Sequence, residues 1–202
     1  MGNALRALRL AARDFWEESL TLILLGLIGG ILIVLVLPIP FVLAAHYGVA
    51  ARIPEQRTIG WRDWVAVGRA HAPFFYRWFL LVLGITLLFL GSAYFYTELG
   101  ATWALALSGL SGGLLLLWWL PQPFVPALYF QQEDRSLRTT LRNATVLAFS
   151  NPAAPLILWG SLIALFFPLS YIAVPLLLLL AIWMALYSTR VVWRQLGHPD
   201  YV

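Results

Sequence analysis

The residues that could do chemistry in this chain are few and scattered. Residues 109–113 read Gly-Leu-Ser-Gly-Gly, which satisfies the G-x-S-x-G pattern found around nucleophilic serines. That nucleophile needs a strand–turn–helix setting and a partner histidine, whereas Ser111 falls inside an apolar stretch and only His198 follows it. The sequence also contains no metalloprotease, phosphate-loop or dinucleotide motif. We therefore expect no catalytic residue, no metal site, no cofactor and no enzyme activity.

Other polar residues, His46, His71 and Glu98, are far apart in the sequence. His46 follows a proline-rich stretch, and because no second ligand lies near it we expect an interfacial side chain instead of a metal ligand. Glu98 is expected to be a solvated acid in a short loop.

Three arginines, Arg135, Arg138 and Arg142, are the best candidates for an anion site. They could bind a phosphate group of a lipid or of a partner protein. A simpler interpretation is that they mark the cytoplasmic side of a membrane protein, where basic residues accumulate.

The composition predicts an integral membrane protein. Of 202 residues, 61% are hydrophobic and only 11% are charged, against about a quarter charged in soluble proteins. Five segments approach the roughly 20 apolar residues that span a bilayer, namely 20–37, 74–95, 102–120, 153–169 and 171–187. We therefore expect an all-α, polytopic protein with about five transmembrane helices in a single membrane domain, residues 1–202.

The apolar segments contain a repeat. Residues 26–42 and 109–125 align without gaps at an offset of 83, with 10 of 17 positions identical. This alignment predicts a parallel internal duplication, with unit one at about 19–97, unit two at about 102–169 and an extra C-terminal span at 171–189. The identities include the residues that set backbone geometry: Gly26, Gly30, Pro38 and Pro40 match Gly109, Gly113, Pro121 and Pro123.

These matched glycines and prolines suggest two roles. The G-x-x-x-G pairs would let helices approach closely, so we expect the first and third spans to cross there. Each pair of prolines removes backbone donors and should break its helix. Broken helices at corresponding positions of two halves can form a binding site, although prolines near the interface often only bend a helix.

Amphipathic segments complete the expected topology. Residues 3–16 resemble an interfacial helix, and 52–77 and 131–150 form two amphipathic connections, with Ser136 as a helix cap. Ten arginines lie in these two connections and the C-terminal tail, which predicts that they are cytoplasmic. The N-terminus is then outside, unless the first apolar segment is a re-entrant hairpin with Pro38 at its tip.

The chain resembles the YesL-type bacterial membrane proteins, a domain of unknown function. The resemblance rests on Leu37-Pro38-Ile39-Pro40, on Asp63-Trp64, and on 136–144 followed by Asn151-Pro152. The family's threonine after the proline motif is replaced by Phe41 here. Members often occur beside sugar-uptake systems, which implies an accessory role in transport.

We therefore expect a non-catalytic, multi-pass protein of the bacterial inner membrane, an accessory or structural subunit of a larger complex linked to sugar or other solute transport. Its partners would be membrane lipids and other membrane subunits, and not nucleic acid. The alternative is a small solute-binding or transport module with its site between the broken helices. A membrane enzyme using Ser111 is the least favoured reading.

Overall fold

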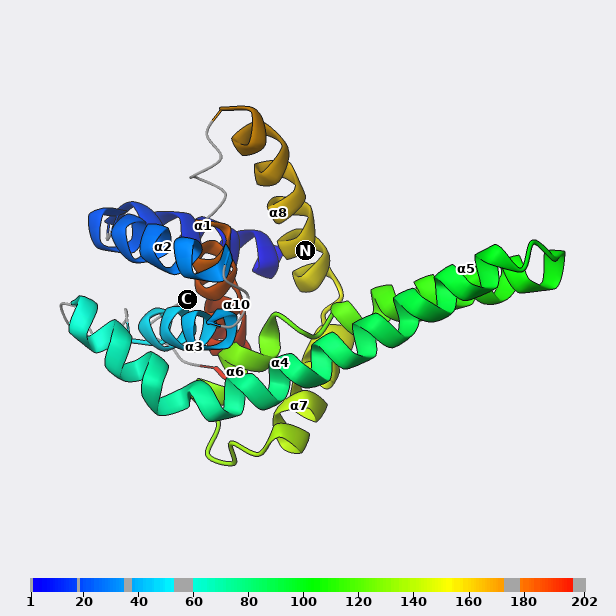
Figure 1. Ribbon diagram of the computed structural model, residues 1–202. Helices are drawn as coiled ribbons and strands as arrows, with labels where there is room; N and C mark the ends of the chain where they lie inside the picture. The colour runs from blue at the N-terminus through cyan, green and yellow to red at the C-terminus, as the bar shows by residue number, and fades with distance from the viewer. Residues whose placement is uncertain (1, 18, 35–37, 53–59, 173–178, 198–202) are drawn as a thin grey trace.

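A computed structural model of the chain describes residues 2–17, 19–34, 38–52, 60–172 and 179–197. The regular elements in these ranges are all helices, which confirms the expected all-α class for this part of the chain (Figure 1). They are α1 (Gly2–Glu17), α2 (Ser19–Val34), α3 (Ile39–Ala50), α4 (Trp61–Glu98), α5 (Thr102–Trp119), α6 (Phe124–Gln131), α7 (Leu137–Ser150), α8 (Ala153–Ile172) and α10 (Leu180–Gln195).

The helix α3 lies at the centre of the fold. Every residue from Val42 to Ala50 is buried, and α3 packs against α2, α4, α6 and α10. A helix that is apolar on all sides is stable only when it is surrounded. The segment that follows the first proline pair is therefore part of the core.

Both proline pairs interrupt the helices, as expected. On one side α2 ends at Val34 and α3 begins at Ile39, and on the other α5 ends at Trp119 and α6 begins at Phe124. Proline has no N–H to continue the helical ladder, so the chain can change direction at these points. As a result α3 and α6 are separate short helices that meet in the core.

The helix α4 is continuous for 38 residues, about 57 Å at 1.5 Å per residue. This corrects the expectation of a surface segment at 52–77 followed by a separate span at 74–95. Pro73 lies inside α4 without ending it. One buried face runs past this proline from Trp64 to Val82, so packing against the rest of the protein holds the two parts in line.

The second half of α4 pairs with α5 in an antiparallel hairpin that projects away from the other helices (Figure 1). Its turn contains Gly100, whose φ of 66° is in the left-handed region that suits glycine. Ser108 Oγ donates a hydrogen bond to the carbonyl of Ala93 (2.9 Å). Large apolar side chains cover the outside of this hairpin, among them Leu80, Leu87, Leu88, Leu90, Tyr94, Phe95, Trp103, Leu110, Leu116 and Leu117.

The helix α7 confirms the second amphipathic segment. Ser136 caps it, since its Oγ accepts a hydrogen bond from the Thr139 amide (3.3 Å), and Ala144 and Ala148 are buried on its apolar face. At Asn151–Pro152 the chain bends by 90° into α8.

The number of membrane spans is smaller than expected in the described residues. Two stretches are long and apolar enough to cross a bilayer: the first is α4, and the second is α5 taken together with α6. A third is added if α7 and α8 count as one bent span. Helices α2 and α10 have 16 residues each, short of the roughly 20 required. Long apolar helices are compatible with a membrane protein.

The directions of the repeated segments also bear on the predicted architecture. In Figure 1, α2 runs from left to right and α5 from right to left. A direction within this view is not a direction across a membrane, so the parallel form of the duplication stays a prediction.

Candidate functional site

Three polar contacts line the first half of α4. Trp64, His71 and Trp78 are spaced seven residues apart, which is close to two helical turns and places them on one face. Each meets a polar side chain from another segment. We call these three residues and their partners the polar stripe.

The first contact joins α4 to α3. Trp64 Nε1 donates to His46 Nδ1 at 3.3 Å, so the proton of the neutral imidazole is on Nε2. Burial lowers the pKa of His46 to about 3, so its ring is neutral at physiological pH. The Nε2 atom is buried and has no hydrogen-bond partner among the described residues. His46 is thus a core residue, and the expectation of an interfacial side chain is wrong.

The second contact joins α4 to α6. His71 Nδ1 and Tyr129 Oη share a hydrogen bond of 3.0 Å, while Phe74 stacks on the Tyr129 ring with 4.0 Å between centroids. Tyr129 is the counterpart of His46 at the offset of 83. Both members of this matched pair therefore bind α4, through positions two turns apart.

The third contact fills the second proline break. Trp78 Nε1 donates to Gln122 Oε1 at 3.0 Å, and Gln122 Nε2 donates to the Trp118 carbonyl at 2.9 Å. Gln122 is almost fully buried between Pro121 and Pro123. The Gln122 side chain therefore donates the hydrogen bond that this carbonyl, near the end of α5, cannot receive within its own helix.

The two proline breaks are also joined directly. The buried hydroxyl of Tyr47 in α3 donates to the carbonyl of Pro123 at 3.0 Å. Pro40, Pro121 and Pro123 are themselves buried, and Pro38 is half-buried. A binding site between the broken helices needs backbone carbonyls that are open to a cavity. Here Tyr47 binds the carbonyl of Pro123 and Gln122 binds the carbonyl of Trp118.

The predicted glycine contacts turn out differently. A Cβ on Gly26 would lie 2.6 Å from a methyl carbon of Leu179 and 3.6 Å from one of Ile182, so Gly26 packs at the start of α10 and not on α5. No atom of the described chain lies within 4 Å of such a Cβ at Gly109 or Gly113. The packing of Gly30 lies outside the described residues.

Gly109 and Gly113 instead line an apolar groove of about 1020 Å³. The other wall comes from α8, with Leu156, Trp159 and Ile163. Ser111, the candidate nucleophile in the same helix, donates to the Leu107 carbonyl of its own helix (2.9 Å), as hydroxyls of apolar helices often do.

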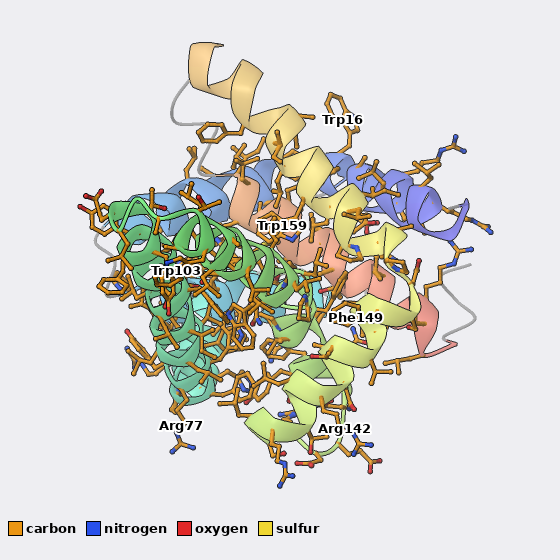
Figure 2. The ribbon with its side chains drawn as sticks, turned by 90° about the vertical axis from the view of Figure 1, so that its right-hand side faces the viewer. Trp16, Arg77, Trp103, Arg142, Phe149 and Trp159 are labelled. Atoms are coloured by element: carbon orange, nitrogen blue, oxygen red, sulfur yellow. The ribbon has the colours of Figure 1, made fainter. Side chains whose placement is uncertain are left out.

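The predicted anion site is only partly assembled. Arg138 and Arg142 are exposed on α7, and the Arg135 guanidinium lies 5.5 Å from the centre of the Tyr129 ring. Nearby, Asp134 accepts hydrogen bonds from Thr139 Oγ1 (2.7 Å) and the Ser136 amide (2.9 Å), which lowers the pKa of its carboxyl. Figure 2 shows Arg142 of α7 and Arg77 of α4 at the lower end of the molecule.

A fourth polar contact joins α1 to α10. Asp14 and Arg190 form a buried ion pair, and the Arg190 guanidinium lies 5.7 Å from the centre of the Trp193 ring. The sequence analysis missed this pair, because 176 positions separate its members. A charged residue within each otherwise apolar helix face was the available signal.

Comparisons with family models, with curated proteins and with solved structures found no match for this chain. The resemblance to YesL-type proteins therefore stays a prediction. We call the described helices outside the α4–α5 hairpin, together with the first half of α4, the base. The geometry shows that polar side chains of the base bind one another, while large apolar surfaces remain open.

Proposed function

We propose that this chain is a non-catalytic integral membrane protein that acts as an accessory or structural subunit of a larger membrane complex. The observation that carries the proposal is the exposed α4–α5 hairpin, whose outer surface is apolar along its whole length. Monomeric soluble proteins rarely expose apolar surface on this scale, so lipid and partner helices are the surroundings that fit it.

The glycines of α5 support a helical partner. Gly109 and Gly113 are four residues apart and open, and an exposed G-x-x-x-G pair lets a second helix come close in lipid. The partner is then an apolar helix of another membrane subunit, and the resemblance to YesL-type proteins suggests sugar or other solute transport as its process.

The experiment is purification from the native membrane in a mild detergent. The wild-type chain should bring down a stoichiometric membrane subunit, and Gly113→Leu should lose it. Gly84→Leu, an open glycine on α4, is the matched control and should keep the partner. A wild-type chain that purifies alone as a monomer would overturn the proposal.

The proposed orientation follows the arginines, with α7 and the base of α4 facing the cytoplasm of a bacterial inner membrane. The Asp14–Arg190 pair supports an N-terminus on the same side as Arg190. This favours the re-entrant form of the first apolar segment over a single crossing. An Asn3→Cys variant that reacts only with a reagent from outside the cell would refute this placement.

The alternative, a solute-binding module between the proline breaks, has less support, because Tyr47 already binds the Pro123 carbonyl there. It predicts a substrate-dependent rise in melting temperature that disappears in Pro40→Ala and Pro123→Ala. No such rise with any sugar tested would remove its support.

A further inference from the structure

The N-terminal helix α1 packs on the protein through its smallest side chains. Ala7 and Ala11 are fully buried against α10, and Asp14 on the same face makes the ion pair with Arg190. Small residues let the two helices come close, and the ion pair fixes their position along each other. The larger apolar residues of α1 therefore face elsewhere.

Those larger residues form one wall of a groove of about 950 Å³. Leu8 and Phe15 of α1 line it on one side, and Leu165 of α8 and Trp183 of α10 on the other. The amphipathic pattern of α1 was expected to place Leu5, Leu8, Ala12 and Phe15 in an interface. In the structure this side faces the groove.

The interior of the groove suits an apolar ligand. Its polar groups include the Trp183 indole, which donates to Ser161 Oγ at 3.3 Å, and Ser161 Oγ, which donates to the Leu158 carbonyl at 2.8 Å. Both are thus satisfied within the protein. Sites of this size commonly hold a ligand of tens of atoms, such as an acyl chain.

One end of the groove is positively charged. Arg9 lines it, and also lines an adjoining recess of about 320 Å³ together with Arg6, Leu5 and Leu10. Leu5 is common to the two hollows as well. Guanidinium groups bind phosphate through paired, charge-assisted hydrogen bonds.

From this combination we propose that the groove binds one anionic membrane lipid. The acyl chain lies between α1, α8 and α10, and the phosphate of the headgroup binds at Arg6 and Arg9. The complementary charge at one end and the apolar groove adjoining it select an anionic amphiphile over a free anion or a neutral lipid. This site is separate from the arginines of α7, and it does not depend on the proposed partner.

The test uses the full-length protein, stripped of lipid in a neutral maltoside detergent. Phosphatidylglycerol should raise its melting temperature, and native mass spectrometry should show one retained lipid per chain. Phosphatidylcholine with the same acyl chains should do neither. In Arg6→Gln/Arg9→Gln the affinity for phosphatidylglycerol should fall at least about tenfold, since two charge-assisted contacts are lost.

The matched control is Arg62→Gln/Arg69→Gln, which removes two exposed arginines of α4 and should bind phosphatidylglycerol as the wild type does. Ala164→Trp should fill the groove and abolish lipid retention. If this variant does not fold, as judged by circular dichroism, Ala12→Trp places the same ring on the opposite wall from an exposed position.

Four results would overturn the proposal. The two arginine variants could lose affinity equally, or the two lipids could bind equally, which would indicate general charge or annular lipid. Inorganic phosphate alone could reproduce the stabilisation, which would indicate an anion site without an acyl chain. Finally, Ala164→Trp could change the oligomeric mass and leave the bound lipid in place, which would make the groove a contact between copies.

Discussion

The two halves of α4 are parts of one helix in opposite surroundings. From Trp64 to Val82 a buried face binds α3, α6 and the second proline break through the polar stripe. Beyond Val82 the helix contacts α5, and leucines such as Leu87 and Leu88 are more than half exposed. The first half is held by the protein, whereas the second half needs a surrounding that the chain does not supply.

Hydrogen bonding separates the two halves in the same way. In the base, side chains far apart in the sequence bind one another, as Trp78 does with Gln122. In the hairpin, Ser92 and Thr97 donate to the carbonyls four residues before them, and Ser108 donates to the carbonyl of Ala93 on the neighbouring helix. Hydroxyls satisfied within the hairpin leave its outer surface free to face lipid.

The largest test of this comparison truncates one large apolar side chain in each half of α4. Phe75→Ala should destabilise the protein by about 3–5 kcal/mol, because Phe75 is fully buried among Trp78, Tyr129 and Phe130. The equivalent change in the hairpin, Leu88→Ala, should cost less than about 0.5 kcal/mol. Denaturant unfolding in detergent measures both, and equal losses would refute the division.

The next effect concerns the second proline break. Gln122→Leu should cost about 2–4 kcal/mol, because it leaves the Trp78 indole and the Trp118 carbonyl buried without their partner. Adding Trp78→Phe should recover part of the loss. A double variant as unstable as the sum of the two single variants would show that the contact carries no coupling energy.

A change of pH should act on the base through His46. Its folded pKa of about 3 lies below the ordinary value of 6.5, so the unfolded chain takes up the proton first as the pH falls. Stability is therefore fully present above about pH 6.5 and is lost as the pH falls toward 3. At pH 5 the loss should be about 2 kcal/mol relative to His46→Asn, which keeps an acceptor for Trp64 and does not titrate. Thermal unfolding of both proteins at pH 7 and pH 5 gives the difference; parallel losses would exclude His46 as the cause.

The smallest expected effect is at the cap of α7. Ser136→Ala should cost about 1 kcal/mol, since the Thr139 amide loses its acceptor. Ser150→Ala at the other end of the same helix is the control and should change the free energy of unfolding little. Unfolding curves that do not distinguish the two variants would show that the cap contributes nothing.

The features that the sequence analysis predicted correctly are local. A proline pair lacks donors wherever it stands, so both breaks could be placed, and Ser136 caps α7 because the residue and the helix start are adjacent. The expected division of α4 into a surface segment and a separate span was wrong for the opposite reason: Pro73 does not end the helix. The face from Trp64 to Val82 continues past it and is held by helices distant in the sequence.

The contacts of the candidate site also join residues distant in the sequence, which local rules do not predict. The spacing of Trp64, His71 and Trp78 could have marked one face of α4, but no local rule pairs these residues with partners 18, 58 and 44 positions away. The burial of His46 had a usable signal, since α3 has no polar face to turn toward water. The offset of 83 between the repeated segments pairs His46 with Tyr129, and the structure shows that both side chains bind α4.

The ion pair between Asp14 and Arg190 also sets an order for synthesis. The carboxylate belongs to α1 and the guanidinium to α10, 176 positions later, so this contact forms only after α10 has been made. Until then α1 has no α10 to dock on. A nascent chain that stops short of Arg190 therefore cannot form the ion pair that fixes α1 against α10.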